Sequence, residues 1–294
     1  MANLKEVRTR ITSVSSTQQI TSAMKMVSAA KFRRAQNAIL GMRPYAAQLG
    51  EIIADIDVED GVQTQYHEIR AVNNVLLVVV TSNKGLCGAF NSNVIKAATS
   101  RIAYYSGVKT QSDSPKVSML TIGKRGTEFF SKQNGLVVGN HDELLDNATF
   151  DAVVDVCDNV MNAFCNKEYD CIEIIYNQFK NSLTQILSTE QFLPVKTKAA
   201  GEGAGKSRND YIYEPGKEQI LRDMIPMTLR SQFYRVILDS LAAEHGARMT
   251  AMQKATDNAT ELLKELRLSY NKARQAAITN EIIEIVSGSE ALKG

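Results

Sequence analysis

The chain has 294 residues, of which 44% are hydrophobic and 22% are charged, and its formal net charge at pH 7 is +2. This composition is ordinary for a globular protein with a buried core, and so small a charge gives no general reason to expect nucleic acid as a partner. No apolar run approaches the ~18 residues of a membrane-spanning helix, so we expect no direct insertion into a membrane.

Residues 1–60 are expected to form one long helix. Asn3 and Glu6 make a variant of the capping box at its start. The next apolar side chains are spaced by three and four residues, which is typical of a coiled-coil seam: Leu4, Val7, Ile11 and Val14. The pattern weakens at Gln18 and Thr21. We expect it to resume at a second set: Met24, Val27, Ala30, Ala38 and Met42.

The first 45 residues are strongly basic. Their only carboxylate is Glu6, against eight cations: Lys5, Arg8, Arg10, Lys25, Lys31, Arg33, Arg34 and Arg43. Charges this close to the start interrupt any signal-peptide core, so the chain is expected either to be made and kept in the cytosol or to be already mature. A helix with this imbalance favours a negatively charged neighbour, although an ordinary solvated basic face accounts for the pattern equally well.

The middle of the chain, residues 70–196, alternates between strand and helix patterns. The apolar, β-branched run at 74–81 predicts a strand buried on both faces. Further strands are expected at 117–122, 136–139, 171–176 and 184–193, and helices at 92–106, 124–133 and 150–166. Such alternation indicates a mostly parallel, Rossmann-like sheet with helices on both faces.

Residues 197–216 read as a flexible loop, because 197–209 have three glycines and no periodicity. A second long helix is expected at 217–288, with a break or kink at Pro226. Its small and apolar residues keep steps of three or four: Leu229, Phe233, Val236, Ser240, Ala243, Ala247, Ala251, Ala255, Ala259, Leu262, Leu266, Tyr270 and Ala273. Sixty helical residues span ~90 Å, so we expect this helix to leave the α/β body and pair antiparallel with the first helix.

The loop Lys84–Asn91 lies where α/β folds place phosphates, between a first strand and a helix. It lacks the Lys-Ser/Thr end of a P-loop and the third glycine of a dinucleotide fingerprint, so a tight structural turn is the favoured reading and nucleotide binding the alternative. Cys87 has no histidine near it in sequence to activate it. The cysteine spacing predicts no metal site: Cys87, Cys157, Cys165 and Cys171.

Two surfaces suggest partners. The C-terminal apolar residues would be exposed beyond the body and favour a socket in another protein: Ile282, Ile283, Ile285 and Val286. The basic cluster Lys31, Arg33 and Arg34 has only Phe32 as an aromatic neighbour, so acidic side chains of a protein fit it better than stacked bases. Near the end, Arg274 is a fork donor suited to a carboxylate.

Several motifs resemble the gamma subunit family of F-type ATP synthases. They lie in the N-terminal helix at 5–8, 20–27, 30–31 and 43–45, in the loop at 85–88 with Asn91, and in the C-terminal helix at 247–252, 255–258, 270–276, 278–282 and 284–288. The resemblance covers nearly the whole chain, and both terminal blocks are highly specific.

This resemblance implies a rotor shaft without a cofactor or catalytic site of its own. The two long helices would form an asymmetric coiled coil inside a ring of alternating alpha and beta subunits. The α/β domain would lie near the epsilon subunit and the membrane c-ring, at the cytoplasmic face of the bacterial plasma membrane. Proton flow would turn the shaft, and each orientation would bias one beta subunit's nucleotide site.

The resemblance also implies contact residues. Arg274 and Gln275 resemble residues that meet a beta-subunit loop, and Met24 and Lys25 resemble the contact with the beta subunit's acidic lever. Some relatives carry glutamate where this chain has Lys25, so attraction of the lever is expected. The foot that meets epsilon and the ring would contain Lys31, Arg33, Arg34, Tyr211, Tyr213 and Glu214.

Two other functions stay open on the residues alone. The parallel sheet and its glycine loop are compatible with a nucleotide-binding enzyme, for which saturable nucleotide binding would be the sign. The basic helix is compatible with a tether for nucleic acid or anionic membranes, which would bind with a steep dependence on salt. Neither explains two long terminal helices and an apolar C-terminus.

Overall fold

The structure is a computed structural model that describes residues 4–60, 65–107, 114–132, 136–181, 184–195 and 216–291. The chain divides into two compact units. The first consists of residues 1–29 and 248–294, and the second of residues 30–247. Two long helices, α1 (Leu4–Asp60) and α5 (Lys217–Ala291), contribute residues to both units.

In the first unit α1 and α5 pack together as an antiparallel pair. Gln18 Nε2 donates a hydrogen bond to Thr260 Oγ1 at 2.7 Å, and Thr21 Oγ1 lies 2.9 Å from Thr256 Oγ1. From Gln18 to Thr21 the residue number rises along α1, while that of the contacted residue on α5 falls from 260 to 256. The two helices therefore run antiparallel. Around these polar pairs the buried apolar side chains are Val7, Met252, Ala259 and Leu263. The expected pairing of the two terminal helices is confirmed.

The seam of α1 follows a strict seven-residue repeat. One series of side chains is buried or half-buried at every step: Val7, Val14, Thr21, Ser28, Ala35, Met42 and Leu49. A second series behaves in the same way: Leu4, Ile11, Gln18, Lys25, Phe32 and Ile39. The expected continuation through Val27, Ala30 and Ala38 is wrong, because these side chains are exposed. Polar residues hold the repeat positions in this stretch, and a search for apolar spacing passes over them.

The second unit contains a five-stranded sheet in the order β3-β2-β1-β4-β5. Its strands are β1 (Asn74–Val80), β2 (Lys116–Ile122), β3 (Val137–Asn140), β4 (Cys171–Phe179) and β5 (Gln185–Leu193). The first four are parallel to their neighbours, and β5 runs antiparallel to β4 at the edge. The mostly parallel α/β sheet predicted from the sequence is confirmed.

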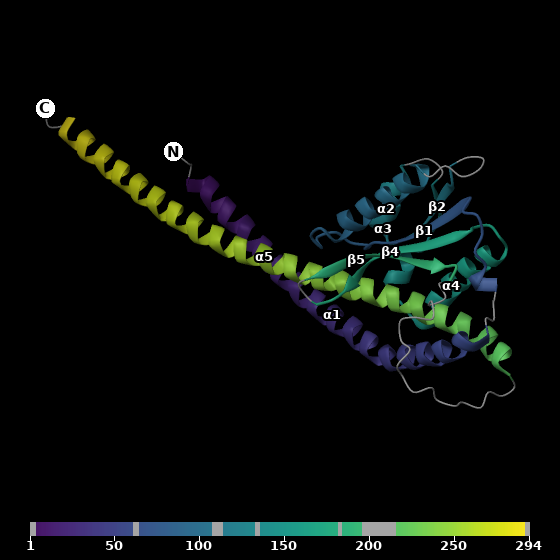
Figure 1. Cartoon of the computed structure of the whole chain (residues 1–294). Helices are drawn as coiled ribbons and strands as arrows, with labels where there is room; N and C mark the ends of the chain where they lie inside the picture. Colours follow the sequence, from purple (N-terminus) through teal and green to yellow (C-terminus); the bar gives the residue numbers. More distant parts are fainter. Residues whose placement is uncertain are drawn as a thin grey trace. The chain divides into compact units, whose positions relative to one another are not determined.

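Helices cover both faces of this sheet, as Figure 1 shows. α2 (Phe90–Gly107) and α3 (Lys124–Phe130) pack on one face, where the odd-numbered residues of β1 meet Val94, Ala98 and Phe130. α4 (Phe150–Cys165) and residues 217–247 of α5 pack on the other, against the even-numbered residues of β1. Every residue from Val75 to Val80 is buried, as expected for a central parallel strand.

Several element boundaries differ from the expectations. α5 runs without interruption through Pro226, so the expected break is absent. α3 ends at Phe130, three residues early, and β4 continues to Phe179, three residues late. The proposed start signal at Asn3 and the loop 197–209 lie outside the described residues. No helix within the described part of the chain is long and apolar enough to cross a membrane.

Candidate functional site

The loop between β1 and α2 is held by hydrogen bonds among its own side chains. The backbone N–H of Ser82 donates to Asn91 Oδ1 at 2.9 Å, and Asn91 Nδ2 donates back to Ser82 Oγ at 2.7 Å. Asn91 Nδ2 also lies 3.3 Å from the Cys87 sulfur, and Ser82 Oγ donates to the Lys84 carbonyl at 2.7 Å. Asn91 therefore ties the first turn of α2 back to the end of β1.

The same loop packs against α5. Leu86 and Gly88 adopt positive φ angles of 62° and 61°, a conformation that costs energy for leucine but little for glycine. This turn buries Cys87, 2% exposed, in a small cluster with Phe90, Phe179, Ala243 and Ala247. The carboxyl end of β1, where α/β folds commonly bind phosphate, thus packs on a helix of the same chain. This arrangement favours the structural turn over the nucleotide site.

Cys87, Cys157 and Cys171 are buried and Cys165 is half-buried, and none of the four forms a disulfide. The Cys87 sulfur lies near an amide and a hydroxyl, neither of which is a base. Burial raises the pKa of the Cys157 thiol, and it also raises the pKa of the Cys165 thiol, so both favour the unreactive protonated form. Within the described residues no group of three or more His, Cys, Asp or Glu side chains could hold a metal ion.

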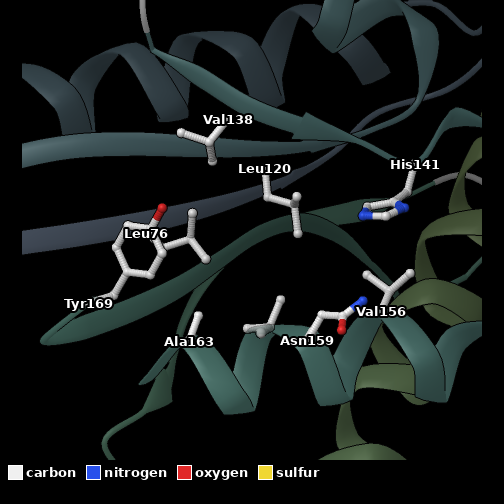
Figure 2. Close-up of a pocket in the computed structure, with 9 residues that line it drawn as sticks. Leu76, Leu120, Val138, His141, Val156, Asn159, Ala163 and Tyr169 are labelled. Carbon is white, nitrogen blue, oxygen red and sulfur yellow. The ribbon is translucent and has the colours of Figure 1, made fainter. Parts of the chain in front are cut away.

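A hollow of about 120 Å³ opens between the sheet and α4 near β3. We call it the β3–α4 hollow, and its lining is Leu76, Leu120, Val138, His141, Val156, Asn159, Val160, Ala163 and Tyr169. Figure 2 shows Leu76 and Leu120 of the sheet facing α4, with His141 and Tyr169 at opposite ends. The walls are mainly aliphatic, and the polar groups are His141, Asn159 and the hydroxyl of Tyr169. Sequence reasoning did not find this feature, because its lining comes from four elements and two loops that are far apart in the sequence.

The contact residues predicted by resemblance lie on helix surfaces. In the first unit Met24 and Lys25 are half-buried, whereas Arg274 and Gln275 are exposed. The register set by the threonine pair places Arg274 about level with Leu4. Twenty residues of helix, ~30 Å at 1.5 Å each, separate that level from Met24, so the two pairs lie at different levels along the helices.

The foot residues are described only in part. Lys31, Arg33 and Arg34 are exposed on α1 in the second unit, and Tyr211, Tyr213 and Glu214 lie outside the described residues. The apolar C-terminal residues Ile282, Ile283, Ile285 and Val286 are 53–71% exposed on α5. Large exposed aliphatic side chains grouped on one helix mark a surface that a partner covers.

Known proteins match this chain over its full length. A family model described as ATP synthase matches residues 3–292. The ATP synthase gamma chain of Flavobacterium johnsoniae is 55% identical over 296 residues, with both chains fully covered. The chain belongs to the ATP synthase gamma chain family. Another member, from Cytophaga hutchinsonii, is 51% identical with 99% of each chain covered. The resemblance seen in the motifs is confirmed.

Solved structures share the fold of this gamma chain family member. A chain from the Euglena gracilis mitochondrial ATP synthase, in a structure titled OSCP/F1/c-ring, aligns with a TM-score of 0.72 at 20% identity. The alignment covers 98% of this chain and 94% of the Euglena chain. A chain from a structure titled as the rotor of the same enzyme gives a TM-score of 0.63 at 21% identity, with 94% and 98% covered.

Proposed function

We propose that this chain is the central rotor shaft of a proton-translocating F-type ATP synthase. It would couple proton flow through the membrane c-ring to ATP synthesis or hydrolysis at the beta subunits, and it would be non-catalytic by itself. Family membership over the full length supports this role. The absence of a metal cluster among the described residues is compatible with this role. The structural support for it is the pairing of the two long helices.

The observation that carries the proposal is the antiparallel pair of α1 and α5. Hydrogen bonds from Gln18 to Thr260 and between Thr21 and Thr256 fix its register. In that register α5 continues for about 17 residues beyond the level of Leu4, and Figure 1 shows it passing the first described turn of α1. A two-helix rod that becomes a one-helix tip has no rotational symmetry, so different sides present different contacts.

Rotation of such an asymmetric rod can bias its surroundings without chemistry of its own. Each orientation would offer a different set of side chains to each beta subunit, and the subunit state that binds that set best would be populated. Arg274 would bind a carboxylate of a beta-subunit loop through its planar fork, with Gln275 beside it. Met24 and Lys25 would form a second contact, where the lysine attracts the acidic lever of a beta subunit.

The remaining partners would bind the part of the chain nearest the membrane. Lys31, Arg33 and Arg34, together with Tyr211, Tyr213 and Glu214, would meet the epsilon subunit and the c-ring. In functional terms we divide the chain into shaft helices at 1–60 and 217–288, an α/β domain at 70–196 and a loop and foot at 197–216. The complex would lie at the cytoplasmic face of the bacterial plasma membrane.

The test is purification of the tagged chain from native membranes, followed by an ATPase assay. A tag at exposed Glu168, on the turn that follows α4, avoids both long helices. Alpha and beta subunits that co-purify with ATP hydrolysis support the proposal. A chain recovered alone and inactive, from membranes in which antibodies still detect the intact synthase, would overturn it.

A further inference from the structure

β3 lies at one edge of the sheet. Among the strands that the structure describes, β3 pairs with β2 alone, so its outer side offers main-chain N–H and C=O groups. Val138, 56% exposed, and Asn140 alternate along this strand with the half-buried Val137 and Gly139. Natural proteins commonly protect such an edge with a charged residue or a proline. β3 carries neither in its sequence Val-Val-Gly-Asn, and its protection consists of its length of four residues and a register shift in its pairing with β2.

The β3–α4 hollow lies directly beside this edge. Val138 belongs to both, and Leu120 of β2 with Val156, Val160 and Ala163 of α4 provides an aliphatic lining. Figure 2 shows Val138 above the hollow and the hydroxyl of Tyr169 directed toward it. A cavity of ~150 Å³ holds a benzene molecule, so about 120 Å³ is enough for one branched aliphatic side chain.

The segment that carries β3 and α4 is acidic, whereas Arg70 lies against Phe164 and Arg230 against Asp158. Residues 136–166 contain no lysine or arginine and six carboxylates: Asp142, Glu143, Asp146, Asp151, Asp155 and Asp158. Asp158 pairs with Arg230, but four others are exposed and form no ion pair within the described part of the chain: Glu143, Asp146, Asp151 and Asp155. Asp151, Asp155 and the lining residue Asn159 are spaced by four residues on α4, so two of the four carboxylates lie on one helix face with a residue of the hollow.

We propose that the β3 edge and the β3–α4 hollow bind an extended segment of another protein, in which lysine or arginine residues flank one aliphatic anchor. The segment adds a sixth strand beside β3 through main-chain hydrogen bonds, and its anchor fills the hollow. The flanking cations pair with Glu143, Asp146, Asp151 and Asp155, which form no ion pair within the residues that the structure describes. The inference is independent of the proposed rotor function.

The first test uses the full chain and a fluorescent peptide in which lysine alternates with valine or leucine. Fluorescence anisotropy at low salt should show saturable binding. Ala163→Phe fills the hollow from α4 and should weaken binding by at least about tenfold, as loss of a buried anchor does. Ala103→Phe, at an exposed position on α2, is the matched control and should leave the affinity unchanged. Thermal melting checks that both variants fold.

A charge variant keeps the test decisive if Ala163→Phe fails to fold. Glu143→Gln, Asp146→Asn, Asp151→Asn and Asp155→Asn are combined in it. This variant should bind the peptide more weakly at low salt, and the difference should shrink at high salt. Neutralising four exposed glutamates of α5, Glu261, Glu265, Glu281 and Glu284, changes the net charge equally and should have no effect on the affinity.

A second test identifies the site in the native assembly. A photo-reactive residue at Val138, in the complex purified from membranes, should crosslink to a Lys- or Arg-bearing extended segment of another subunit. Equal peptide affinity in all variants, or crosslinks only to an acidic or helical segment, would overturn the proposal. Neither result would affect the co-purification test of the rotor function.

Discussion

The side-chain oxygens of Thr21 and Thr256 lie 2.9 Å apart across the two long helices, and each also lies within hydrogen-bond distance of a carbonyl of its own helix. Thr21 Oγ1 is 3.0 Å from the Gln18 carbonyl, and Thr256 Oγ1 is 2.8 Å from the Met252 carbonyl. Two hydroxyl protons serve three possible bonds, so a bond across the seam forms when one hydroxyl donates to the other instead of to the carbonyl of its own helix. This directional contact favours one register of the helices, as a buried polar residue does in a coiled coil.

The losses of unfolding free energy caused by valine substitutions at Thr21 and Thr256 should not be additive. Thr21→Val or Thr256→Val alone replaces an oxygen contact with a methyl group that faces a hydroxyl, which should cost about 1 kcal/mol. The double variant replaces both partners with apolar groups of similar shape and should cost less than the sum of the two. Urea unfolding of the wild-type chain and the three variants forms a double-mutant cycle. Strict additivity would mean that the two hydroxyls do not interact.

Two glycines with positive φ should differ sharply in their tolerance of alanine. Gly88, at φ +61°, has nothing within 4 Å of an added Cβ, so Gly88→Ala should cost only the backbone term of about 1–2 kcal/mol. At Gly123, φ +113°, the Cβ would lie 2.3 Å from the Thr81 carbonyl oxygen. Gly123→Ala must therefore move the β1 backbone and should be clearly more destabilising. Equal midpoints in chemical denaturation would contradict this ranking.

Buried tyrosines should make the chain sensitive to alkali. Burial raises the pKa of Tyr105, whose hydroxyl donates to the Glu173 carboxylate at 2.8 Å, and burial likewise raises the pKa of Tyr176. A tyrosine in the unfolded chain ionises near pH 10. The stabilisation is therefore fully present below pH ~10 and is lost as the pH rises toward the higher folded pKa.

The readout is the free energy of unfolding as a function of pH. It should fall above pH ~10, and the slope should be smaller for Tyr105→Phe, although that variant is less stable at neutral pH because Glu173 loses a donor. Absorbance near 295 nm follows tyrosine ionisation directly. A slope that is the same with and without Tyr105 would show that this hydroxyl ionises normally in the folded chain.

The proposed contact at Arg274 and Gln275 predicts a loss of coupling without a loss of folding. Both side chains are exposed, so Arg274→Ala with Gln275→Ala should change stability by less than about 0.5 kcal/mol. ATP-driven proton pumping by membrane vesicles should fall more than stability does. Asn271→Ala with Lys272→Ala, at exposed neighbouring positions, is the matched control. Normal pumping by the Arg274/Gln275 variant would remove these residues from the contact.

The regular parts of the fold could be predicted because their patterns are local. Six consecutive apolar residues from Val75 identify a central strand, and the spacing of Val153, Val156, Val160 and Phe164 identifies a helix with one buried face. The seam of α5 could also be read, since every residue from Leu229 to Ala273 in the expected series is buried or half-buried. In each of these elements the spacing of the apolar side chains is enough to identify the element and its buried face.

Predictions for other parts of the fold were wrong because polar residues, or contacts with residues distant in sequence, determine the structure there. Thr21, Ser28 and Gln18 occupy seam positions where only a search for period seven, without regard to polarity, would place them. β4 was predicted to end before Asn177, yet that side chain is buried and its Nδ2 donates to the Phe90 carbonyl 3.1 Å away. Pro226 predicts a helix break, yet α5 continues through it. Ile225 and Leu229, on either side of the proline, are buried in the core beside the sheet, and their packing stabilises the helical turn.

The last turns of α5 have a consequence for how assembly can be observed. About 17 residues lie beyond the level of Leu4, where the described part of α1 offers no companion. An isolated helix of that length is marginal in water, so its amide hydrogens should exchange with solvent within seconds to minutes in the free chain. Enclosure by other subunits would slow that exchange, and the tip of the helix would report, residue by residue, whether its socket is filled.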